Sequence, residues 1–170
     1  MDSTNLIKAQ NRIIVKLLWV VTILAFANNA LTVRDPIAGG LIVIFIGGFA
    51  LGMSYLVYTN KMIQQSKYLA VAGMFLASFI FIQFTPGILS YFTIYICLFI
   101  LSIYHDRQVI LVSGILAFLL SSYSFIFHRN MIFHPRYDSF LSMISINFFI
   151  ILACCLLVLQ IKFGSRLYRD

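Results

Sequence analysis

The side chains that most often do chemistry in proteins lie outside the long apolar runs of this chain. The three histidines, His105, His128 and His134, stand at the ends of such runs, no Asp lies inside one, and the chain contains no Glu. Ion-coupled carriers usually need an ionisable group within the membrane. Intramembrane haem sites need paired histidines, and metal-dependent hydrolases need clusters of His and carboxylate. The pattern therefore disfavours these classes and predicts a protein that is not an enzyme and has no cofactor.

One histidine-containing stretch has a spacing of interest. His128, Met131 and His134 lie three residues apart, so they would share one face if the segment were helical. Imidazole and thioether together suit copper, and the two imidazoles could also titrate as an external pH sensor. A solvated loop explains the same residues without a ligand. We prefer the loop, so no metal site is predicted.

The cysteines and the turn at residues 105–107 give no catalytic pattern. Cys97, Cys154 and Cys155 lie inside apolar runs, and their spacing fits no zinc site. The turn has no serine or cysteine nucleophile beside it. We expect Asp106 to cap the helix that follows.

Polar residues within the apolar runs are candidates for ligand recognition. Asn28, Asn29, Gln83 and Thr85 all fall in the half of the runs expected to face outward, where they could line a small ligand pocket. Hydrogen bonds between helices explain them equally well. Further polar residues in apolar runs are Ser121, Ser122 and Asn147.

Glycines gather in the second apolar run. Residues 48–52 form a GxxxG motif, which lets two helix backbones approach closely, and the set comprises Gly40, Gly47, Gly48 and Gly52. This set predicts either a homodimer face or packing within one bundle, and we favour packing. A similar stripe of small residues in the third run is expected to face the second run; it comprises Ala70, Gly73 and Ala77.

The elements that must position these residues are membrane-spanning helices. The chain is 62% hydrophobic and only 10% charged, whereas soluble domains carry about 25% charged residues. A spanning helix needs about 20 mostly apolar residues. We predict an all-α bundle that forms a single transmembrane domain, with six spans at 13–33, 37–58, 68–84, 88–104, 109–127 and 140–162 and an exit helix at 163–170. A hairpin that dips partway into the membrane is the disfavoured alternative for the third and fourth spans.

The basic residues set the predicted orientation. Nine of them fall on one side of the six spans and three on the other, so the excess of positive charge predicts that both termini are cytoplasmic. The side with nine comprises Lys8, Arg12, Lys16, Lys61, Lys67, Arg107, Lys162, Arg166 and Arg169. Residues 25–27 resemble a signal-peptide cleavage site, but the apolar run continues to Val33, so we expect a retained first helix. We predict that the protein lies in a cell membrane, and we favour the plasma membrane of a bacterium.

Six short stretches of the chain together carry a family resemblance, and they lie at residues 11–19, 102–107, 113–116, 123–125, 137–138 and 160–164. They resemble the N-terminal six-helix membrane module of bacterial methyl-accepting chemotaxis proteins and related signal transducers. It implies signal input, dimerisation and an exit through the last helix at Lys162, Gly164 and Arg166 to a cytoplasmic partner or output domain. The chain would then be either a sensor fragment of a longer receptor or a stand-alone protein.

These observations lead to a non-enzymatic sensory domain as the leading functional hypothesis, with the lipid bilayer, a homodimer partner and a signalling partner as its contacts. One alternative is a small transporter or channel subunit that acts as an oligomer. Another is a membrane assembly or scaffold subunit that works through the glycine face. No nucleic-acid partner is expected, because the basic residues lie at the ends of apolar runs.

Overall fold

The long apolar runs of this chain form helices, because a helix satisfies every backbone polar group internally where no water is present. The computed structural model describes residues 3–33, 36–84, 87–132 and 139–167, which form helices and their short connections. The chain divides into two compact units, Met1–Thr85 and Pro86–Asp170.

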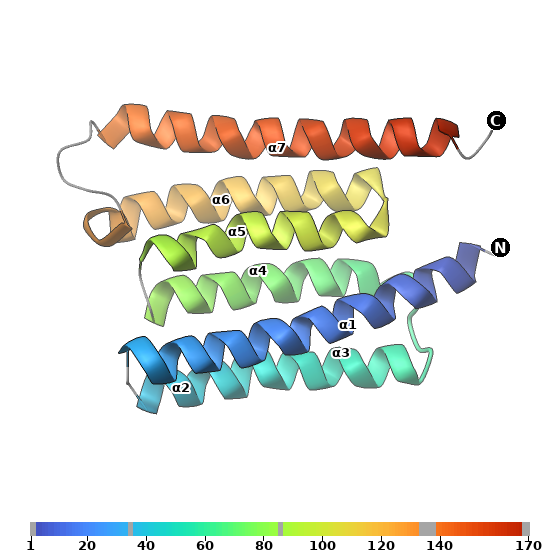
Figure 1. Cartoon of the computed structure of the whole chain (residues 1–170), viewed down its shortest axis with the longest axis horizontal. Coiled ribbons are helices and arrows are strands. Elements are labelled where there is room, and N and C mark those ends of the chain that lie inside the picture. Colours follow the sequence, from blue (N-terminus) through green and yellow to red (C-terminus); the bar gives the residue numbers. More distant parts are fainter. Residues whose placement is uncertain (1–2, 34–35, 85–86, 133–138, 168–170) are drawn as a thin grey trace. The chain divides into compact units, whose positions relative to one another are not determined.

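The described part of the first unit forms three helical segments. The first is α1 (Ser3–Asn28), which continues as a π-helical turn, η1 (Asn29–Val33). The second consists of α2 (Pro36–Ile42), the π-helical turn η2 (Val43–Gly47) and α3 (Gly48–Tyr58). The third is α4 (Ser66–Phe84). Figure 1 shows α1 lying along α2 and α3. Pro36 occupies the first position of α2. The backbone N–H that proline lacks would have no partner within the helix at that position, so its absence does not weaken the helix.

All three helical segments contribute side chains to the core of the first unit. One cluster of buried side chains comprises Ala25, Ile42, Ile46, Ala77 and Phe81. In addition, the ring of Phe49 on α3 lies directly over Gly73 on α4, where a Cβ atom would overlap it. The expectation that the small residues of the third run face the second run is therefore confirmed at Gly73.

The second unit contains α5 (Ile88–Leu101), which ends in a 3-10 turn, η3 (Ser102–Tyr104), followed by α6 (Arg107–Ile132) and α7 (Ser139–Leu167). Helix α6 packs against both α5 and α7 (Figure 1). His105 adopts a left-handed conformation (φ 48°) that ends η3. The backbone N–H of Gln108 then donates to Oδ1 of Asp106 at 2.9 Å, which confirms the predicted cap.

The helices agree closely with the predicted spans but extend further. Helix α1 begins ten residues before the first predicted span, and α6 continues past residue 127 through a break at His128 (φ −122°, ψ 18°). The predicted loop at 128–139 is therefore helical as far as Ile132, and residues 133–138 lie outside the described part. The predicted exit segment continues α7 as far as Leu167.

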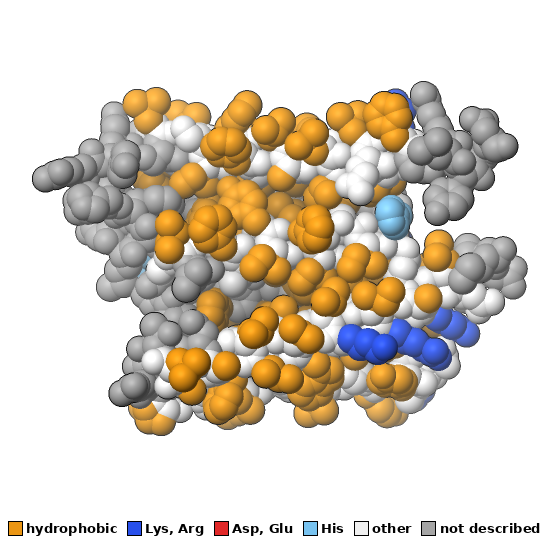
Figure 2. Space-filling view, in the orientation of Figure 1, with side chains coloured by type: hydrophobic (Ala, Val, Ile, Leu, Met, Phe, Trp, Pro, Cys, Tyr) orange, Lys and Arg blue, Asp and Glu red, His pale blue; other side chains and the backbone are white. Residues whose placement is uncertain are grey.

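Among the residues that the structure describes, five helices are long and apolar enough to cross a membrane, whereas the helix at Ser90–Tyr104 is shorter. The outer surfaces of the described helices carry many large apolar side chains, such as Leu31, Ile37 and Phe99, each more than 70% exposed. Figure 2 shows such side chains spread over the face it draws. A water-soluble protein rarely exposes apolar patches this large, so these helices indicate a membrane protein.

Candidate functional site

A cluster of uncharged polar side chains lies between the three helices of the second unit. We define the polar cluster as Tyr91 and Tyr95 on α5, Ser121 and Ser122 on α6, and Asn147 on α7. The hydroxyl groups of Tyr91 and Ser121 form a hydrogen bond of 2.7 Å, in which either oxygen can donate. The two tyrosine rings meet edge to face, with their centroids 6.1 Å apart, because they lie one helical turn apart on α5.

Two longer contacts connect the polar cluster to α7. The hydroxyl of Tyr95 donates to the carbonyl oxygen of Ile146 at 3.3 Å, and Nδ2 of Asn147 donates to Oγ of Ser122 at 3.5 Å. Good O–H···O bonds are about 2.7–2.8 Å long and good N–H···O bonds about 2.9–3.0 Å, so both contacts with α7 are weaker than the Tyr91–Ser121 bond. The side chain of Asn147 is only 6% exposed, and its Oδ1 atom has no hydrogen-bond partner among the described residues.

The cluster forms because one face of α6 carries small side chains. Ser113, Ala117, Ser121 and Ser124 follow one another at three- or four-residue intervals, and each is at most 2% exposed. Small residues at this spacing let neighbouring helices approach closely. On α7, Asn147 and Ile150 are both buried.

The chemistry available in the polar cluster is that of hydroxyl and amide groups, which donate and accept hydrogen bonds without changing charge. Such groups recognise polar partners and hold helices together. Among the described residues, no three His, Cys, Asp or Glu side chains come together as a metal site would require.

The pocket predicted in the first unit is only partly visible. Asn29 lies in the π turn η1, is 3% exposed, and has its Oδ1 atom 2.9 Å from the place where a Cβ on Gly39 would lie. Its Nδ2 atom has no partner among the described residues. Gln83 is half-buried near the end of α4. The side chain of Asn28 and all of Thr85 lie outside the described part, so the pocket stays a prediction.

The four glycines of the predicted packing or dimer face do not share one environment. Gly47 is buried, and a Cβ on it would lie 3.8 Å from Cγ2 of Thr22 on α1. Gly40, Gly48 and Gly52 are exposed, and a Cβ on any of them would meet nothing within 4 Å. Within the described part, only Gly47 of this set packs against another helix. A homodimer face at the other three stays a prediction.

The remaining candidate residues lie apart from the polar cluster in the sequence. Lys162 is exposed on α7, and Gly164 and Arg166 follow in the same helix, although their side chains are not among those described. His128 lies at the break in α6, with its ring 6.2 Å from that of Tyr123. His134, which shares the three-residue spacing with His128 and Met131, lies outside the described residues.

The sequence signalled the serines and Asn147 of the polar cluster, because polar side chains in apolar runs are conspicuous. It did not signal the two tyrosines, since Tyr91 near the end of a span is equally typical of a membrane interface. Their spacing of four residues was the available clue.

Comparison with known proteins gives no match: no protein-family model, no curated protein and no solved structure is similar to this chain.

Proposed function

We propose that the chain is a membrane-embedded signal-input module, in which α7 carries a change at the polar cluster to the cytoplasmic side. The observation that supports this proposal is the continuity of α7. One unbroken helix, Ser139–Leu167, contains both Asn147 and the exposed Lys162. At a rise of about 1.5 Å per residue, these two residues are about 22 Å apart along the axis. A rigid helix of that length transmits a shift or a rotation from one end to the other.

The packing of α7 also suits a moving element. Only 17% of its span is buried, compared with 50% for α4. The contacts that connect it to the polar cluster are long, and Oδ1 of Asn147 has no hydrogen-bond partner in the part of the chain that the structure describes. A ligand or lipid that completes these hydrogen bonds would favour one position of α7 over another, which is the differential binding that a two-state switch requires.

The proposed topology has six spans with both termini in the cytoplasm of a bacterial cell. The basic residues support this orientation. The six-span count depends on the short helix at Ser90–Tyr104, whose 15 residues extend about 22 Å, less than the hydrocarbon thickness of about 30 Å. Local thinning of the bilayer accommodates such a mismatch at modest cost.

A cysteine-accessibility experiment tests the topology. Cysteines at Lys61, Gly87 and His105, introduced singly into a variant without Cys97, Cys154 and Cys155, would be labelled with an impermeant maleimide in sealed vesicles. We expect positions 61 and 105 to react from the cytoplasmic side and position 87 from the other. Equal sidedness of positions 87 and 105 would mean that α5 does not cross, so that the chain has five spans and its termini lie on opposite sides.

Transmission through α7 is tested with a spin label at position 162 in the full chain in liposomes. We expect Asn147→Leu to change the mobility of this label, whereas Phe148→Leu, an exposed position one residue further on, should not. An unchanged spectrum for Asn147→Leu would contradict the proposal. Reproducible solute flux through the same liposomes would favour the transporter alternative instead.

A homodimer is part of this proposal, because signal transducers of the kind this chain resembles act as dimers. The open glycines on α2 and α3 support a contact there. Gly48→Leu should then abolish self-association measured by cross-linking in liposomes, whereas Leu51→Ala, at a neighbouring exposed position, should not. Unchanged association of Gly48→Leu would exclude this face.

A further inference from the structure

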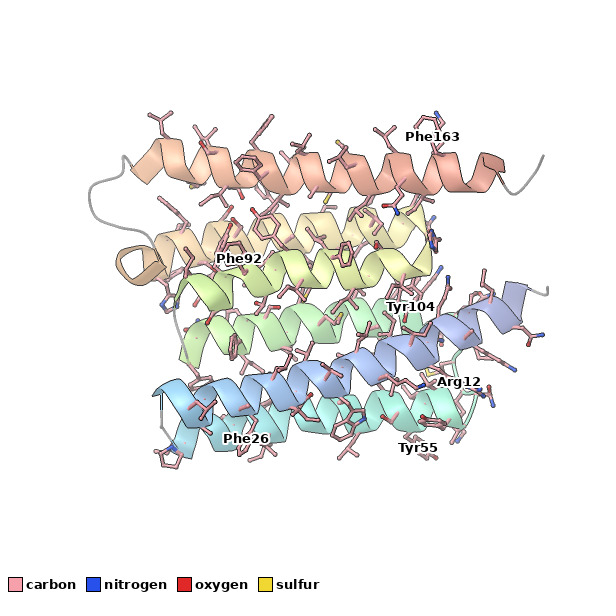
Figure 3. The ribbon with its side chains drawn as sticks, in the orientation of Figure 1. Arg12, Phe26, Tyr55, Phe92, Tyr104 and Phe163 are labelled. Carbon is pink, nitrogen blue, oxygen red and sulfur yellow. The ribbon has the colours of Figure 1, made fainter. Side chains whose placement is uncertain are left out.

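The N-terminal part of α1 has two contrasting faces. Lys8, Arg12 and Lys16 follow one another at intervals of four residues, so they lie one above the other on a single side of the helix. We call these three residues the basic stripe. Arg12 and Lys16 are exposed, and Lys8 is partly exposed. Figure 2 shows Lys and Arg side chains as a blue band at the end of the first unit that holds the N-terminus, and Figure 3 labels Arg12 there.

The opposite face of α1 is buried and fixes the rotation of the helix. Gln10, Asn11 and Ile14 are each at most 6% exposed. Nδ2 of Asn11 donates to the carbonyl oxygen of Ile63 at 3.1 Å, which connects α1 to the polar loop between α3 and α4. The basic stripe is consequently held outward, toward whatever surrounds the first unit.

The same hydrogen bond sets the depth of the basic stripe. The loop of Ile63 separates two apolar helices, so it marks the membrane interface. Arg12 is one residue beyond Asn11 and therefore lies at that level. Lys16 is five residues beyond Asn11, about 7.5 Å further along the axis toward the apolar side. Ile13 and Val20, the apolar neighbours of Lys16 along the helix, are about half exposed.

The charges of the basic stripe have no partner of opposite sign within the described part of their unit. Residues 3–33 and 36–84 contain no Asp or Glu. The other two lysines of this end do have aromatic partners: Nζ of Lys61 lies 5.7 Å from the ring centroid of Tyr55, and Nζ of Lys67 lies 5.0 Å from that of Tyr68. Among the described residues, the basic stripe makes no hydrogen bond, ion pair or ring contact.

From these observations we propose that the basic stripe binds the headgroup of one anionic phospholipid, with its phosphate between Arg12 and Lys16. A positive charge on the lipid-facing side of an apolar helix is costly unless it reaches an anion. The flexible chain of Lys16 can extend its ammonium group back to the level of Arg12. The guanidinium group of Arg12 matches a phosphate with two parallel hydrogen bonds. Lys8, one turn further out, adds a charge near the rest of the headgroup.

This inference depends on the membrane placement of α1 but not on signalling through α7. Charge complementarity and depth together favour a lipid over free phosphate, because the acyl chains would lie on the exposed apolar side chains that continue along the same helix, such as Ile23.

The test is lipid binding by the full chain in detergent, followed by native mass spectrometry. The probes are phosphatidylglycerol and phosphatidylcholine with the same acyl chains, and inorganic phosphate alone. We expect phosphatidylglycerol to bind at lower concentration than phosphatidylcholine. Arg12→Gln and Lys16→Met should each raise the half-saturating concentration of phosphatidylglycerol about fivefold. Lys67→Met, the control in the same unit, should change it less than about twofold.

A charge-retaining variant separates loss of the site from loss of the fold. Lys16→Arg should bind phosphatidylglycerol as the unmodified chain does, and the helical circular dichroism of all variants should be equal. Equal affinity for the two lipids, an equal loss in Lys67→Met, or competition of inorganic phosphate at the same concentration as the lipid would each overturn the proposal. The label at position 162 reports on signalling separately, so the two proposals can fail independently.

Discussion

Gly114 on α6 and Cys154 on α7 approach so closely that a Cβ atom on Gly114 would lie 3.6 Å from the Cβ of Cys154. Disulfides have Cβ–Cβ distances of about 3.5–4.5 Å. The pair therefore offers a direct measurement of how α6 and α7 face each other in the second unit, the relationship on which the polar cluster depends.

We predict that Gly114→Cys forms a disulfide with Cys154 under mild oxidation. The experiment uses a background in which Cys97 and Cys155 are serine, and mass spectrometry after proteolysis identifies the linked peptides. Ile115→Cys is the matched control, because Ile115 is 63% exposed and points to another side of α6. Cross-linking of position 115 but not of position 114 would show that α6 is rotated relative to the structure.

A Cβ at Gly73 would overlap the ring of Phe49, so we expect Gly73→Ala to destabilise the first unit by about 1–3 kcal/mol. The measurement is unfolding in mixed detergent micelles. Gly52→Ala is the matched control in micelles dilute enough to keep the chain monomeric, since nothing in its own chain lies within 4 Å of a Cβ there. It should be neutral or more stable by up to about 1 kcal/mol, because alanine favours helix.

The Gly73 prediction has an internal check. Adding Phe49→Ala to Gly73→Ala removes the overlapping ring, so the two changes together should cost less than the sum of their separate effects. Strict additivity would mean that the ring does not lie over Gly73.

The hydrogen bond between Tyr91 and Ser121 should be measurable by a double-mutant cycle. Tyr91→Phe and Ser121→Ala are each expected to lower stability, with a coupling energy of about 0.6 kcal/mol, the average for hydrogen bonds inside membrane proteins. The cycle that pairs Tyr95→Phe with Ser121→Ala serves as control and should give a coupling near zero. Equal coupling in the two cycles would indicate that Tyr95, rather than Tyr91, bonds to Ser121 at least part of the time.

The cap at the start of α6 gives a fourth prediction. Asp106→Ala leaves the N–H of Gln108 without its acceptor and should cost about 1 kcal/mol in unfolding free energy. Asp106→Asn keeps an oxygen acceptor at the same place and should retain most of the stability. A loss in Asp106→Asn as large as in Asp106→Ala would show that the negative charge matters, not the hydrogen bond.

The sequence alone determined that the chain folds into apolar helices and located its six apolar runs, although α1 begins ten residues before the first predicted span. Turn chemistry contributed at Asp106, which was expected to cap the helix that follows it and does so. The ends of the helices were predicted less accurately than their centres, because a helix can continue past the apolar run, as α1, α6 and α7 all do. The sequence also pointed to Ser121, Ser122 and Asn147, because polar groups in apolar surroundings need partners.

Only the tertiary structure decided which faces meet. It separated Gly47, which packs near Thr22, from Gly48, which is open, and it placed Gly73 under Phe49 and Tyr91 beside Ser121. The physical reason is that lipid and protein interior are equally apolar, so a spanning helix carries little contrast between its lipid-facing and buried sides. In water the burial of apolar residues reveals the packed face of a helix. In this chain the packed faces are determined by side-chain shape, which becomes visible only when the partner helix is in place.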